Sequence, residues 1–181
     1  MADRISFSGQ HLELPKIVAQ HTDVESSLRS YFSPTSVNYT MRFADYIEPE
    51  VRDELDIRLA EHDRTTIFAI LAALEAAFRI DYLQRSYKKK KDPLSRGFRD
   101  LHRKKGSRAS LEEEILDQWK EHSSVPGKLI GDLKGAFKYR HWLAHGRYWE
   151  PKLGQKYDYD GVYILAETIL NSFPLEGINN T

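Results

Sequence analysis

The sequence predicts an all-α protein, a helical bundle of five to seven helices. Apolar residues recur at helical spacing along most of the 181-residue chain, and the period-two alternation of strands is scarce. Proline, glycine and aspartate residues stand between these segments, where helices begin and end. We interpret residues 1–181 as a single domain with its core over 45–175, and residues 1–44 as an N-terminal helix and loop without an assigned role.

The most apolar segment, 64–90, is expected to form the central helix. Its first half is apolar on all sides, which is typical of a buried helix, and Asp63 is placed to cap it after a separate helix at 48–62. The complete set of expected helices is 15–32, 48–62, 64–90, 93–104, 111–122, 126–145 and 161–173, with loops at 33–40 and 150–160.

Capping residues support the later helices. Ser110 is expected to cap 111–122, and Asp160 to cap 161–173, because side-chain oxygens accept hydrogen bonds from the first free backbone amides. Gly146 is expected just beyond the end of the helix that contains the apolar stripe of Leu129 and Phe137.

The composition excludes several classes of protein. The chain has no cysteine, so disulfides, thiolate zinc sites and a cysteine nucleophile are excluded together. The longest apolar run, 67–78, is too short to span a membrane, which takes about 20 residues, and Glu75 interrupts it. The N-terminus lacks the apolar core of a signal peptide. We therefore expect a cytoplasmic protein without a membrane partner.

The net charge is zero, but it is unevenly distributed. Residues 85–108 hold 11 Lys and Arg against 2 acids, so the remaining chain holds 16 against 25. A block of like charge is a candidate phosphate-binding surface, although it is also typical of a solvated connection between helices. The basic residues expected to contact RNA are Lys88, Lys89, Lys90, Lys91, Arg103, Lys104 and Lys105.

The stretch RHWLAHGRYW, residues 140–149, is unusual for the end of an amphipathic helix. His141 and His145 are one turn apart and share a face, and Arg140 is long enough to reach toward them. A guanidinium matches phosphate oxygens bidentately, and an imidazole transfers protons near neutral pH. Together these groups suit attack of the ribose 2′-OH on the adjacent phosphate, which yields a 2′,3′-cyclic phosphate without metal or cofactor.

The motif YRHWLAHG resembles the signature of the HEPN superfamily, small all-α proteins of which many are metal-independent ribonucleases. Their pattern is Arg, four to six residues, then His, near a helix end, often with Asn, Asp or His directly after the Arg. The resemblance implies Arg140 and His145 as the catalytic pair, with His141 in support. It also implies a homodimer in which two motifs face each other and form a composite active site.

The resemblance further implies a role in growth arrest, as a toxin or in phage defence, with an antitoxin or regulatory protein as partner. Some such toxins carry a Tyr two residues after the His. This chain departs from them, because position 147 is Arg and Tyr148 follows one residue later. Tyr148 is also a candidate for stacking on RNA bases.

Glu75 is the only charge in its apolar run, so it needs a partner. Arg79, one helical turn on, is the local choice. Arg140 from the neighbouring helix is the other choice, and the carboxylate would then orient the catalytic guanidinium. A network shared by Glu75, Arg79 and Arg140 is the third possibility.

Three other readings of the 140–149 stretch stay open. The polar helix end can simply satisfy its own carbonyl groups. His141 and His145 have the spacing of a helical metal pair, although the metalloprotease version requires Glu where this chain has Trp142. Finally, the fold can serve as a non-catalytic module that binds RNA or another protein.

Overall fold

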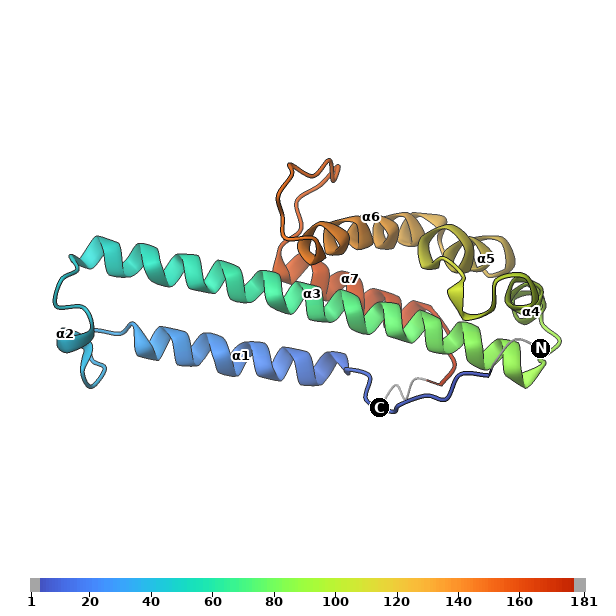
Figure 1. Ribbon diagram of the computed structural model, residues 1–181, viewed down its shortest axis with the longest axis horizontal. Coiled ribbons are helices and arrows are strands. Elements are labelled where there is room, and N and C mark those ends of the chain that lie inside the picture. The colour runs from blue at the N-terminus through green and yellow to red at the C-terminus, as the bar shows by residue number, and fades with distance from the viewer. Residues whose placement is uncertain (1–3, 178–181) are drawn as a thin grey trace.

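Helix α3 (Glu48–Lys88) is the spine of the molecule. In the computed structural model, which describes residues 4–177, it runs without interruption for 41 residues, a length of about 60 Å at 1.5 Å per residue. Figure 1 shows the remaining helices arranged around it. The first and last residues of the expected domain, 1–3 and 178–181, lie outside the described residues.

The predicted break at Asp63 is wrong. No glycine or proline occurs between residues 50 and 92, so nothing interrupts the backbone hydrogen bonds of α3. Asp63 is used for a tertiary contact instead, because its Oδ1 lies 2.9 Å from Nε2 of His21 on the neighbouring helix.

Helix α1 (Leu14–Tyr31) packs beside the first half of α3, and the two form an arm that extends from the bundle (Figure 1). The short α2 (Tyr39–Arg42) lies at the tip of this arm, where the sequence predicts a loop over 33–40. At the base of the arm the buried His21 ring stacks on Tyr159 of α7, with ring centroids 3.8 Å apart. The arm is thereby joined to the bundle.

Four helices gather on the second half of α3: α4 (Pro93–Lys105), α5 (Leu116–His122), α6 (Gly127–Ala144) and α7 (Tyr159–Ser172). With α1, α2 and α3 they make seven α-helices and no strand within residues 4–177, which confirms the predicted all-α bundle.

Aromatic rings fill the centre of the bundle. The ring of Phe78 on α3 packs edge-on against Phe173 and against Trp119 of α5, with ring centroids 5.0 Å and 6.3 Å apart respectively. All three side chains are fully buried. Edge-to-face packing of this kind adds to the hydrophobic gain of burial. The second half of α3 is therefore the centre of the core, as its apolar sequence predicts.

The helix caps agree with the sequence in one case and differ in another. Ser110 accepts a hydrogen bond from the amide of Glu113, as expected, and opens a π-helical turn at Leu111–Ile115 that leads into α5. Asp160 does not cap α7, because the helix begins earlier and Asp158 accepts from the amide of Gly161. No helix within residues 4–177 combines the length and apolar composition needed to cross a membrane.

Candidate functional site

The candidate site lies where α6 ends. Ile130, Leu133 and Phe137 bury one face of this helix against the core, which leaves His141 and His145 exposed on the outside. Gly146 follows the helix with a positive φ of 78°, a conformation that glycine adopts without steric cost. The predicted helix end is confirmed.

The two histidines lie close together, as their spacing predicts. The ring centroids of His141 and His145 are 4.2 Å apart, and the rings are inclined at 49°. Both rings are open to solvent, so a ligand can reach either imidazole.

Arg140 and Arg79 share the carboxylate of Glu75. Nη1 of Arg140 lies 2.8 Å from Oε2 of Glu75, and Nε of Arg79 donates to Oε1 at 2.8 Å. This is the shared network, the third of the alternatives that the sequence leaves open. The side chain of Glu75 is about one-fifth exposed and that of each arginine about one-third exposed, so water still reaches part of the network.

Arg140 is held from a second side by the ring of Phe68 on α3, whose centroid is 5.2 Å from the guanidinium carbon. Its Nε is buried and has no hydrogen-bond partner among the described residues. Within residues 4–177 no hydrogen bond, ion pair or ring contact joins Arg140 to either imidazole. The structure thus brings the two histidines together, and in the described part of the chain it anchors the side chain of Arg140 to α3 without such a contact to either of them.

The loop that follows α6 is tied back to the helix. Nε1 of Trp142 donates to the backbone oxygen of Trp149 at 2.6 Å. This places the Trp149 ring 6.2 Å from His141 and 6.5 Å from His145, between centroids. Tyr148 remains 83% exposed and meets Trp149 edge-on at 4.7 Å.

A second contact ties the loop to α3. Nη1 of Arg147 lies 2.6 Å from Oε2 of Glu61, which also pairs with Arg64 at 3.0 Å. The hydrogen bond from Arg147, reinforced by Arg64, lowers the pKa of Glu61 against a smaller effect of burial. Position 147 therefore holds a cation that pairs with α3.

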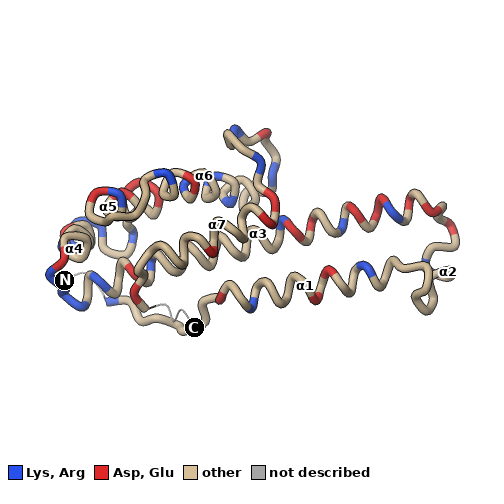
Figure 2. The backbone as a smooth tube through the Cα atoms, turned by 180° about the vertical axis from the view of Figure 1, so that it is seen from behind, with Lys and Arg blue, Asp and Glu red and all other residues tan. Residues whose placement is uncertain are grey.

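The basic residues predicted to contact RNA gather at the far end of the bundle, on α4 and the end of α3 (Figure 2). The histidines lie at the C-terminal end of α6, and within residues 4–177 no hydrogen bond or ion pair joins them to these basic residues. Exposed Lys89, Lys91 and Lys104 have no ion pair within residues 4–177.

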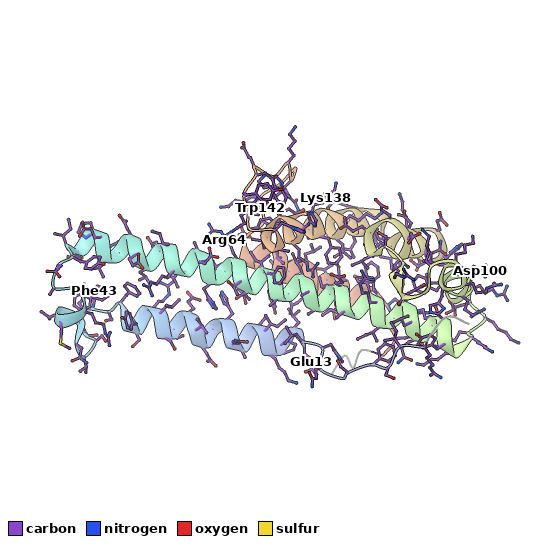
Figure 3. The ribbon with its side chains drawn as sticks, viewed as in Figure 1. Glu13, Phe43, Arg64, Asp100, Lys138 and Trp142 are labelled. Atoms are coloured by element: carbon purple, nitrogen blue, oxygen red, sulfur yellow. The ribbon has the colours of Figure 1, made fainter. Side chains whose placement is uncertain are left out.

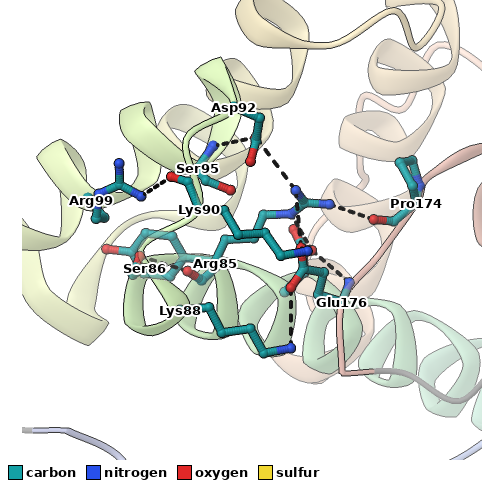
Figure 4. A network of polar contacts seen from close by, with 11 residues as sticks. Arg85, Ser86, Lys88, Lys90, Asp92, Ser95, Arg99, Pro174 and Glu176 are labelled. Atoms are coloured by element: carbon teal, nitrogen blue, oxygen red, sulfur yellow. Dashed lines mark hydrogen bonds and ion pairs between the residues drawn. The ribbon is translucent and has the colours of Figure 1, made fainter.

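The other four predicted RNA contacts already have acidic partners. Lys88 and Lys90 both pair with Glu176, beside the buried Arg85 (Figure 4). Arg103 pairs with Asp100, and Lys105 pairs with Glu114 at 3.1 Å. Part of the positive charge of this segment is thus neutralised within the protein.

Sequence reasoning missed a pocket beside His141. It has a volume of about 370 Å³, and its charged lining residues besides His141 are Glu112, Lys138 and Lys152. Figure 3 shows Lys138 with Trp142 on α6, below the raised loop. Lys138 lies one helical turn before His141, a spacing that could have identified it. Glu112 comes from the π-helical turn, and no local pattern connects it to α6.

Burial raises the pKa of Glu112, and the nearby charges of Lys138 and His141 oppose this effect. No group of three or more His, Cys, Asp or Glu side chains in the described part of the chain is placed to hold a metal ion. Comparison with protein-family models, with curated proteins and with solved structures found no match.

Proposed function

We propose that the protein is a metal-independent endoribonuclease of the HEPN type, which cleaves RNA by attack of the 2′-OH and leaves a 2′,3′-cyclic phosphate. The observation that carries the proposal is the end of α6, where the ring centroids of two exposed imidazoles lie 4.2 Å apart and the arginine of the same motif is anchored by Glu75. His145 is the general acid or base, Arg140 stabilises the charge on the phosphate, and His141 is the supporting proton-transfer group.

The distance between the histidines also bears on the number of subunits. The attacking and leaving oxygens lie on opposite sides of the phosphorus, and a proton-transfer group is needed beside each. His141 and His145 project from one face of one helix with ring centroids 4.2 Å apart, so both imidazoles approach a bound phosphate from the same side. One subunit's pair is therefore too close together to stand on both sides of a phosphate. A homodimer with facing motifs would supply the second side.

The biological role we propose is growth arrest, in a toxin–antitoxin pair or in phage defence, with RNA as substrate. It rests on the resemblance of the 140–149 stretch to the HEPN signature. A non-catalytic module that binds RNA or protein is the alternative, and it differs in one measurable respect, the absence of cleavage.

The test is cleavage of an end-labelled single-stranded RNA in EDTA, with product ends identified by mass spectrometry. Replacement of a general acid or base costs about 10²–10⁴-fold, so His145→Ala is expected to lose cleavage. His122→Ala on α5 is the matched control and should cleave like the wild type. Cleavage that requires a divalent ion, or a fully active and dimeric His145→Ala protein, would contradict the proposal.

A further inference from the structure

The pocket beside His141 is continuous with the proposed catalytic site, because His141 lines both. Three parts of the chain line this open pocket. They are the last turns of α6, the following loop from Trp149 to Leu153, and Glu112 of the π-helical turn. A nucleotide whose phosphate is held at the histidines would therefore place its base, or its neighbour's base, at this pocket.

The pocket walls suit a nucleobase next to a phosphate. The half-buried indole of Trp149 offers a flat apolar face, and its backbone is fixed by the hydrogen bond from Trp142. Proteins that bind single-stranded RNA recurrently stack its bases on aromatic rings. The exposed ammonium groups of Lys138 and Lys152 supply positive charge at the rim.

Glu112 is the group in this pocket that can distinguish one base from another. Its side chain is partly buried, and within residues 4–177 it has no hydrogen bond and no ion pair. Partial burial of a carboxylate that accepts no hydrogen bond from the protein costs free energy, which a ligand with hydrogen-bond donors would recover. The burial also raises the pKa of Glu112.

Among the four RNA bases, only guanine presents two adjacent donors, N1–H and the N2 amino group, on its Watson–Crick edge. A carboxylate has acceptors only, and its two oxygens match this pair bidentately. Adenine and cytosine each place an acceptor beside their single amino group, and uracil places its one N–H between two carbonyl oxygens. A carboxylate would face a repelling acceptor on each of these three bases.

We propose that this pocket binds a guanine base of the RNA substrate, with Glu112 accepting hydrogen bonds from N1–H and N2–H and Trp149 stacking on the ring. Lys138 is the donor available to guanine O6. The assignment of RNA as ligand rests on the proposed function, but the base preference can be measured without cleavage.

The experiment uses short fluorescein-labelled RNAs in which every 2′-OH is methylated, so that transesterification cannot occur. A uridine tract with one central guanosine is compared with the same tract carrying adenosine, cytidine or uridine, and binding is followed by fluorescence anisotropy. A good bidentate contact discriminates by about 1–3 kcal/mol, so the wild type is expected to bind the guanosine oligomer about tenfold more tightly.

Glu112→Gln is the decisive variant, because the amide offers one donor and one acceptor and thereby matches adenine instead of guanine. The expected result is loss of the guanosine preference, with a shift toward adenosine. Glu113→Gln, an exposed neighbour that does not line the pocket, is the matched control and should keep the wild-type preference. If Glu112→Gln fails to fold, Glu112→Asp tests the same contact by withdrawing the carboxylate.

The outcomes separate the two proposals. Equal binding of all four oligomers, no binding at all, or an unchanged preference in Glu112→Gln would overturn the guanine pocket, whatever the cleavage assay shows. A guanosine preference that Glu112→Gln abolishes, in a protein that cleaves no RNA, would support the pocket and remove only the nuclease.

Discussion

Glu75→Gln tests whether the carboxylate of α3 holds the candidate catalytic arginine in place. The two arginines use different oxygens of Glu75, Arg140 pairing with Oε2 and Arg79 donating to Oε1. A glutamine has one acceptor oxygen, so it can serve only one of them, and its amide group would face the other guanidinium. The substitution therefore removes two charge–charge contacts and at least one hydrogen bond without changing the size of the side chain.

The magnitude follows from the exposure of the network. An exposed ion pair contributes about 0–1 kcal/mol, whereas removal of one partner from a buried pair costs about 3–5 kcal/mol. The side chains of Glu75, Arg79 and Arg140 are 21%, 39% and 29% exposed, which is between these limits. We expect Glu75→Gln to lower the free energy of unfolding by about 2 kcal/mol, or Tm by about 4–8 °C for a chain of this size.

The assay is thermal and urea unfolding followed by circular dichroism. Glu54→Gln is the matched control, because Glu54 pairs with Arg58 one turn on in the same helix but with no second arginine. It should change the free energy of unfolding by less than about 1 kcal/mol. If Glu75→Gln and Glu54→Gln lower the free energy of unfolding equally, Glu75 does not anchor Arg140.

Three further predictions concern groups outside the network. Burial raises the pKa of Asp81 from 3.8 to about 6, so the folded state holds this proton longer than the unfolded state. The free energy of unfolding therefore falls by about 2 kcal/mol as pH rises from about 4 to about 7. In urea titrations at a series of pH values, Asp81→Asn should remove this part of the pH dependence. Gly135→Ala places a Cβ 2.4 Å from the hydroxyl oxygen of Tyr157, so the ring must move and its fluorescence or NMR signals should shift. Glu61→Gln breaks the ion pair with Arg147 and should speed hydrogen exchange in the 147–157 loop, with unfolding changed by less than about 1 kcal/mol; unchanged exchange there would refute this role.

Local patterns were enough to predict the all-α fold and most helix ends. The cap at Ser110 and the terminal glycine at 146 depend only on neighbouring backbone amides and on a positive φ, so they can be read from a few residues. The proximity of His141 and His145 follows from the pitch of a single helix. The prediction of a helix start at Asp63 was wrong, because an aspartate that could cap a helix can equally lie within one. Its side chain contacts His21 instead.

Contacts between distant segments were decided by the tertiary structure. The sequence indicates that Glu75 needs a partner, but only the packing of α6 on α3 brings Arg140 within 2.8 Å of the oxygen that Arg79 leaves free. The pocket beside His141 likewise depends on tertiary packing, because Glu112 reaches it from the π-helical turn while its other lining residues come from α6 and the loop that follows. Helical spacing carries information over one or two turns, whereas the relative placement of helices depends on how all the apolar faces fill one core. The sequence by itself therefore determined most of the helices and the proximity of the two histidines, and the tertiary structure decided which groups from other segments surround the end of α6.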